Sequence, residues 1–175
     1  MFKSFRQFVP SSICLKCDGC CRFKEADSHW RPYIAQSEKV AAAKPGVVDK
    51  VFGEHVVGSD QRLKTTPCAQ GHLCHFLNAR DNTCGIYHAR PFECQLYPFL
   101  LGREAQKIVV YVHLNCPHIQ DHWNDQSYRD YAQYLKGFFK RDDVQNFLKA
   151  NPGIIGDYAA HRDELDFVFE VIEER

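Results

Sequence analysis

The chain has 175 residues, which suits one domain, since a core of this size buries about two-thirds of the surface that the unfolded chain exposes. Its 22 basic and 22 acidic side chains cancel, so no net field would draw it to nucleic acid or to an anionic membrane. Residues 1–10 lack the apolar stretch of a signal peptide, and nothing later approaches the roughly 18 apolar residues of a membrane span. We therefore expect a cytoplasmic protein with neither nucleic acid nor membrane as a partner.

Cysteine is the residue type that stands out, with nine in the chain. In a reducing compartment, cysteines at this density are more often metal ligands or catalytic groups than disulfides. The odd count also argues against a fully paired disulfide framework, because one cysteine is left over in any scheme of pairs. The composition thus favours a metal protein.

The first four cysteines, Cys14, Cys17, Cys20 and Cys21, form a C-x-x-C-x-x-C-C run that we expect to lie in a loop, because Gly19 interrupts it. Two intervening residues let neighbouring thiolates converge on one ion or on one iron–sulfur cubane. Zinc knuckles and bacterial-type ferredoxins use this spacing. Adjacent side chains point apart in extended backbone, so either the chain turns sharply at Cys20-Cys21 or two sites share the loop.

Further along, residues 35–44 are rich in helix formers and stop at Pro45-Gly46, which predicts a short helix. Residues 97–101 and 107–113 flank a polar segment with Gly102, and the second stretch is β-branched. This pattern predicts a β-hairpin.

The chain after Cys116 changes character. Ser127 is placed to cap a helix running to about residue 141, and a second helix is expected over residues 142–150. The first of these helices carries an apolar stripe that we interpret as core, formed by Tyr128, Tyr131, Tyr134, Leu135, Phe138 and Phe139. Residues 165–172 fit a helix or a strand equally well.

Several motifs together resemble one family. They are the C-x-x-C-x-x-C-C run, Cys74-His75-Phe76-Leu77, the segment from Cys84-Gly85-Ile86-Tyr87 through Arg90-Pro91 to Cys94, Tyr97-Pro98-Phe99, and a late Cys116. This combination is similar to that of the CxxCxxCC family, the YkgJ-type cysteine cluster proteins with a zinc- or iron-chelating domain. The resemblance covers residues 14–118 and implies a set of eight metal ligands, Cys14, Cys17, Cys20, Cys21, Cys74, Cys84, Cys94 and Cys116. Cys68 lies outside the pattern, as a replacement ligand or as a buried thiol.

The fold expected from these elements is α+β: a single domain over residues 1–175, with cysteine-rich metal-binding loops, a short β-hairpin and C-terminal helices. Residues 14–118 would form the metal-chelating region and residues 119–175 a mainly helical extension. The all-thiolate set favours an iron–sulfur cluster of the 4Fe–4S type. Zinc stays open, since four cysteines or a mixture with His72, His75 or His118 would also satisfy it. We expect Arg90 to support the cofactor by donating hydrogen bonds to sulfur, unless it packs on Tyr87 or pairs with Glu93.

No nucleotide-binding glycine loop, nucleophile elbow or metalloprotease motif is present in the sequence, so it names no catalytic residue. A structural or electron-carrying metal protein is the first hypothesis. Because the resembled family includes flagellin lysine N-methylases, a metal-dependent protein lysine N-methylase that uses S-adenosylmethionine is the second. A zinc-dependent module that docks a protein partner is the third.

Overall fold

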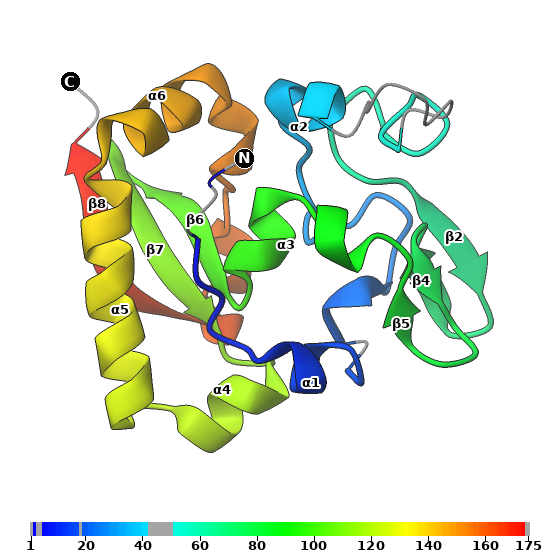
Figure 1. Cartoon of the computed structure of the whole chain (residues 1–175), viewed down its shortest axis with the longest axis horizontal. Coiled ribbons are helices and arrows are strands. Elements are labelled where there is room, and N and C mark those ends of the chain that lie inside the picture. The colour runs from blue at the N-terminus through cyan, green and yellow to red at the C-terminus, as the bar shows by residue number, and fades with distance from the viewer. Residues whose placement is uncertain (1, 3–4, 18, 42–50, 174–175) are drawn as a thin grey trace. The chain divides into compact units, whose positions relative to one another are not determined.

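The structure, a computed structural model, describes residues 2, 5–17, 19–41 and 51–173. Its chain divides into two compact units (Figure 1). The first unit comprises residues 1–6 and 10–95, and the second comprises residues 7–9 and 96–175. Both contain helices and antiparallel strands, so the expected α+β class is confirmed. The assignment of residues 1–175 to one domain, with a division at residue 118, stays a prediction.

The first unit is built from short elements. Its helical segments are α1 (Ser11–Cys14), η1 (Gly19–Cys21), α2 (Gln36–Ala41), η2 (Tyr87–Ala89) and α3 (Phe92–Leu96), the last of which crosses into the second unit. Its strands are β1 (Arg22–Phe23), β2 (Thr65–Cys68), β3 (Gly71–Cys74), β4 (Leu77–Asn78) and β5 (Thr83–Cys84). They form an antiparallel sheet of order β1-β3-β2 and a separate β4-β5 pair.

Gly71, at the tight turn between β2 and β3, has a φ of 121°, a region that side chains rarely adopt. A Cβ there would stand 2.5 Å from the carbonyl oxygen of Phe23, so the backbones of β3 and β1 approach closely only because this residue is glycine.

A small apolar cluster forms the core of the first unit. It consists of Phe23, Ile34, Phe52, Val56, Val57, Leu63 and Cys74, with Cys21 and Ile86 among the partly buried residues packed against it. Two of the predicted ligands, Cys74 and Cys21, therefore pack in or against the core of this unit.

The predicted helix over residues 35–44 is present as α2, which begins at Gln36. Residues 42–44 lie outside the described part of the chain. The run of four cysteines is not an irregular loop, because α1 and η1 place helical turns at both of its ends. The chain does turn sharply at Cys20-Cys21, the first of the two expected alternatives.

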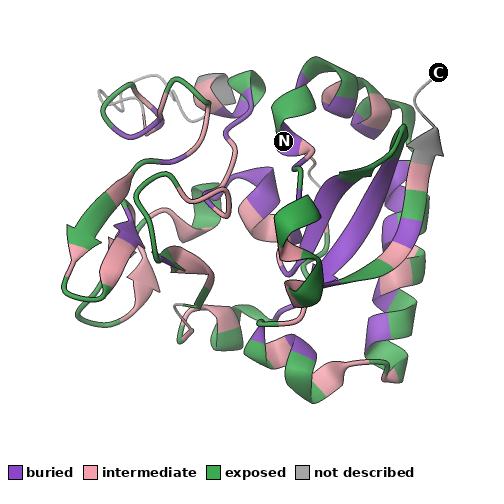
Figure 2. Cartoon of the chain, turned by 180° about the vertical axis from the view of Figure 1, so that it is seen from behind, coloured by how far each residue is buried: buried purple, intermediate pink, exposed green. Residues whose placement is uncertain are grey.

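The second unit is built on an antiparallel sheet of order β6-β7-β8. The predicted hairpin is confirmed as β6 (Phe99–Glu104) and β7 (Lys107–His113), with Ala105 in the left-handed region at its turn. Residues 165–172, left open between helix and strand, belong to strand β8 (Leu165–Glu173). Strands β6 and β7 are the most buried part of the sheet, as Figure 2 shows.

Among its described residues, the second unit also contains the helical segments α4 (Pro117–His122), α5 (Gln126–Phe139), α6 (Asp142–Ala150), η3 (Pro152–Ile154) and η4 (Ala159–Glu164). Both predicted helices are confirmed. The predicted stripe on α5 is largely buried, with Tyr134 only partly so, and Phe139 lies 6.4 Å from Phe169 of β8 between ring centroids. Ser127 is not the cap, because the side chain of Asp125 accepts the hydrogen bond from the amide of Tyr128. No helix within the described residues is both long enough and apolar enough to cross a membrane.

Candidate metal centre

Local turns bring the N-terminal cysteines together. Helix α1 starts after Pro10, whose carbonyl oxygen accepts the amide of Cys14 at 2.9 Å. The amide of Cys17 then donates to the carbonyl oxygen of Cys14 at 3.3 Å, which closes a further turn. A 3₁₀ turn over Gly19–Cys21 follows, so Cys20 and Cys21 lie on turned rather than extended backbone.

The later cysteines come from three other elements of the first unit. Cys74 ends strand β3 and is buried, with 8% of its surface exposed. Cys84 ends strand β5, and Cys94 lies in α3. Short strands and a short helix thus fix the backbone of each residue that the sequence predicts as a ligand in this part of the chain.

The thiols of Cys20, Cys21 and Cys74 form a chain of contacts. A hydrogen bond with the thiol of Cys20 raises the pKa of Cys21 well above its usual value. The pKa of Cys74 is also raised, by its hydrogen bond with Cys21 and then by burial. Residues more than fifty positions apart in the sequence therefore meet side chain to side chain.

Cys84 and Cys94 extend this group. Burial raises the pKa of both thiols, and the nearby charge of the Cys74 thiolate raises each of them further. Cys14 acts in the same way on Cys84. Pairwise interactions thus link six of the eight predicted ligands, Cys14, Cys20, Cys21, Cys74, Cys84 and Cys94. The raised pKa values of Cys21, Cys74, Cys84 and Cys94 mean that a metal bound by these thiols must displace their protons.

Arg90 places a positive charge beside this group. Its side chain is buried, and Nη1 donates to Sγ of Cys14 at 3.2 Å. Its Nε donates to the carbonyl oxygen of Tyr87 at 3.1 Å, and its guanidinium carbon lies 3.6 Å from the centroid of the Tyr87 ring. The same charge lowers the pKa of Cys84 and of Cys94. Arg90 therefore both contacts sulfur and packs on tyrosine, which the sequence presented as alternatives.

Glu93, next to Cys94, has partners of its own. Its carboxylate accepts the backbone amide of Tyr33 and lies 3.8 Å from Nη1 of Arg62. Burial raises the pKa of Glu93 to about 7, although the charge of Arg62 opposes this shift. The contact ties α3 to the segment before α2.

Glu38 makes a second tie between the same segments. It is 5% exposed, and its carboxylate oxygens accept the amide of Ala35 at 2.9 Å and the amide of Phe92 at 2.6 Å. Glu38 thereby caps the start of both α2 and α3. Neither Glu38 nor Glu93 was predicted to support the site. The one local signal is a glutamate three residues after the first residue of the predicted helix, as in a capping box, and it gives no indication of the distant partner.

Three cysteines stand apart from the six. Cys17 is half-buried, and its Sγ would be 3.7 Å from a Cβ placed on Gly19. Cys68 ends β2 opposite Gly71 and is half-buried, so it is not the fully buried thiol that one alternative expected. Cys116 belongs to the second unit, where it is buried at the start of α4.

The two histidines that flank Cys74 in the sequence, His72 and His75, have contacts of their own. His72 lies on β3 with Nδ1 at 3.4 Å from the hydroxyl of Thr65, and His75 is exposed with its ring against Phe76. Across the described residues, no group of three His, Cys, Asp or Glu side chains is arranged to hold one metal ion. The donors of the thiol group are soft sulfur atoms, which suit zinc, copper(I) or iron–sulfur chemistry.

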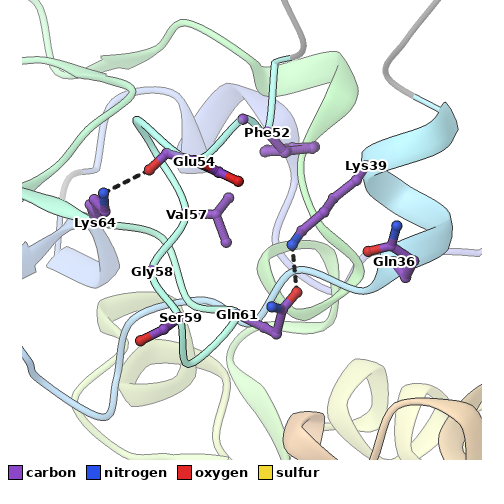
Figure 3. A pocket seen from close by; sticks show the side chains of 10 residues that line it. Gln36, Lys39, Phe52, Glu54, Val57, Gly58, Ser59, Gln61 and Lys64 are labelled. Atoms are coloured by element: carbon purple, nitrogen blue, oxygen red, sulfur yellow. Dashed lines mark hydrogen bonds between the residues drawn. The ribbon is translucent and has the colours of Figure 1, made fainter.

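A cavity of about 830 Å³ opens elsewhere in the first unit (Figure 3). Its lining includes Lys39, whose Nζ donates to the side-chain oxygen of Gln61 at 2.5 Å, and Lys64, whose Nζ donates to the carbonyl oxygen of Glu54 at 2.6 Å. None of its lining residues is a cysteine. The cavity is therefore not formed by the predicted ligands.

Comparison with known proteins agrees with this picture. Residues 13–117 match the CxxCxxCC family, described as "Putative zinc- or iron-chelating domain". No curated protein and no solved structure matches the chain. The matched segment spans more than half of the chain and contains all eight predicted ligands. This protein belongs to the CxxCxxCC family of zinc- or iron-chelating domains.

Proposed function

We propose that this protein holds an iron–sulfur cluster of the 4Fe–4S type and has a structural or electron-carrying role. The ligands are drawn from the eight-cysteine set Cys14, Cys17, Cys20, Cys21, Cys74, Cys84, Cys94 and Cys116. A bound cluster would cross-link the segments that carry its ligands and would supply one-electron transfer. The reducing compartment expected from the cysteine content would keep the thiols available for it.

The observation that carries the proposal is the electrostatic coupling of six thiols that come from separate elements. Cys14 and Cys94 are eighty positions apart, yet both belong to this group. Left empty, so many thiols in one place would be prone to oxidation, which disfavours a purely structural set of free cysteines.

Two features favour a cluster over a single zinc ion. The ligand set is all thiolate and comes from separate elements of the chain, and an inorganic core spans more distance than an ion does. The guanidinium of Arg90 also suits a buried cluster, because hydrogen bonds to sulfur offset its negative charge.

The lysine N-methylase alternative would need an open cleft beside the metal. The cavity in the first unit is lined by no cysteine, and so it gives that alternative no support. The alternative of a zinc-dependent interaction module differs from our proposal in the metal that is bound. It becomes the better hypothesis if the purified protein is colourless and contains zinc.

The test is anaerobic purification followed by a visible absorption spectrum and by iron, sulfide and zinc analysis on one sample. We expect a brown protein with a broad visible band and with iron and sulfide in about equal amounts. A colourless protein with one or two zinc ions would overturn the cluster assignment while leaving the chelating domain intact.

Cysteine variants assign the ligands. Cys17→Ser and Cys94→Ser should lose metal and aggregate more readily, because metal binding is part of folding in such domains. Cys68→Ser is the matched control, since Cys68 lies outside the family pattern and should retain full metal content. Unchanged metal content and stability in both Cys17→Ser and Cys94→Ser would contradict the assignment.

A further inference from the structure

Helix α4 in the second unit carries two histidines on one face. His118 and His122 are four residues apart, a spacing that brings side chains together on a helix. Their ring centroids lie 4.3 Å apart with an interplanar angle of 50°. Paired histidines at this spacing on one helical face are a recurring way to chelate zinc and similar ions.

The ring of His122 is held in place by Asp125. Oδ2 of Asp125 lies 2.9 Å from Nδ1 of His122, while Oδ1 of the same carboxylate accepts the amide of Tyr128 at 2.9 Å. Asp125 is therefore fixed by its role as the cap of α5 and in turn fixes the imidazole. A hydrogen bond from Nδ1 to a carboxylate leaves the lone pair on Nε2, which is the arrangement found behind histidines that bind metal.

His118 is supported on its other side by packing. Its ring lies 5.2 Å from that of Phe8, between centroids. Asp121 and Asp125 both act on His118 electrostatically, so two carboxylates place negative charge near the histidine pair. No hydrogen bond joins His118, or Nε2 of His122, to another residue of the described chain.

We propose that His118 and His122 together bind a divalent first-row transition-metal ion of the nickel, copper or zinc type. The ligands are imidazole nitrogens, so this site differs in chemistry from the thiol group and does not depend on what that group binds. Within the described residues no third ligand joins the pair, so the remaining coordination positions would be taken by water. The ion is thus exchangeable and open to a further donor.

Nickel titration of the purified protein tests the site, followed by calorimetry and by near-ultraviolet absorption in buffer free of added thiol or chelator. We expect His122→Gln and His118→Gln each to weaken one nickel-binding event at least about tenfold, because even the loss of a supporting outer partner costs 10–100-fold. Asp125→Asn should weaken the same event less than either histidine variant. His88→Gln is the matched control, since it removes an exposed histidine from the first unit.

Two outcomes would overturn the proposal. One is nickel affinity that stays the same in His118→Gln and His122→Gln. The other is nickel binding that brings a sulfur-to-metal absorption band and survives His122→Gln, because the ion is then held by thiolates. His122 is 40% exposed, so His122→Gln is expected to fold and decides the matter even if His118→Gln does not.

Discussion

Removing the buried carboxylate of Glu38 should destabilise the first unit more than removing an exposed charged side chain does. The side chain is almost fully buried and accepts hydrogen bonds from two backbone amides, those of Ala35 and Phe92. Glu38→Ala leaves both donors without this partner at the starts of α2 and α3. The effect does not require a metal, although α3 also carries Cys94.

The magnitude follows from the two donors. A buried donor left without a partner costs about 1–3 kcal/mol, so the pair costs about 2–6 kcal/mol. Removing a buried carboxylate recovers part of its desolvation cost, and burial does raise the pKa of Glu38. We therefore expect a net loss of about 2–4 kcal/mol. Glu38→Gln keeps one acceptor oxygen and turns an amide group toward the other donor, so it should lose about half as much.

Urea unfolding followed by tryptophan fluorescence measures this loss. The chain has one tryptophan in each unit, so a Trp123→Phe background leaves Trp30 as the reporter of the first unit. Glu25→Ala in that background is the control, because Glu25 is exposed and surface substitutions usually change stability by less than about 0.5 kcal/mol. If Glu38→Ala unfolds at the same urea concentration as Glu25→Ala, the carboxylate does not hold α2 and α3 together and the reasoning fails.

Three further substitutions test other parts of the structure. Arg90→Lys keeps the charge but loses the guanidinium geometry at Cys14 and Tyr87, so metal should dialyse away about 10–100-fold more readily than from Arg80→Lys, which alters an exposed arginine. Gly102→Ala should cost about 1–3 kcal/mol in urea unfolding, since a Cβ would lie 2.4 Å from the Tyr111 ring, whereas Gly137→Ala on α5 meets nothing within 4 Å and should stabilise by about 0.5–1 kcal/mol. Asp125→Ala should destabilise α5 more than Ser127→Ala does, because Asp125 is the N-cap. Hydrogen bonds from Ser127 and Tyr128 hold the pKa of Asp125 well below its usual range, so the stabilisation by the cap is present above the unfolded-state pKa and is lost as the pH falls through the folded-state pKa. Urea midpoints measured over a series of pH values test this dependence.

The regular elements could be predicted because their signals are local. The β-branched run over residues 107–113 next to a polar turn defines a hairpin, and the apolar spacing over residues 128–139 defines α5. The predicted N-cap of α5 was wrong by two residues, because Asp125 and Ser127 are both residue types that favour an N-cap and only the geometry decides between them. Strand β8 could not be distinguished from a helix, because its apolar residues pack on partners that are distant in the sequence.

The candidate site was predicted only as far as its cysteines. The spacing of Cys14, Cys17, Cys20 and Cys21 carries information by itself, because ligands separated by two intervening residues can meet at one ion or cluster. The contacts of Glu38 and Glu93 carry no such signal, since a glutamate that caps a distant helix looks like any other glutamate in the sequence. Charged residues are buried when specific donors surround them, and those donors here are backbone amides from remote segments.

Arg90 shows how the charges of this unit fit its proposed cofactor. Each thiol that binds metal gives up a proton and becomes an anion, and burial makes that ionisation unfavourable, as the raised pKa values of Cys84 and Cys94 indicate. A buried guanidinium lowers this cost, because its positive charge favours the anion, and Arg90 does lower the pKa of Cys84 and of Cys94. The ring and the carbonyl oxygen of Tyr87 hold the guanidinium in place, while its Nη1 donates to Sγ of Cys14. The positive charge of Arg90 would therefore offset part of the negative charge of a thiolate-bound cluster.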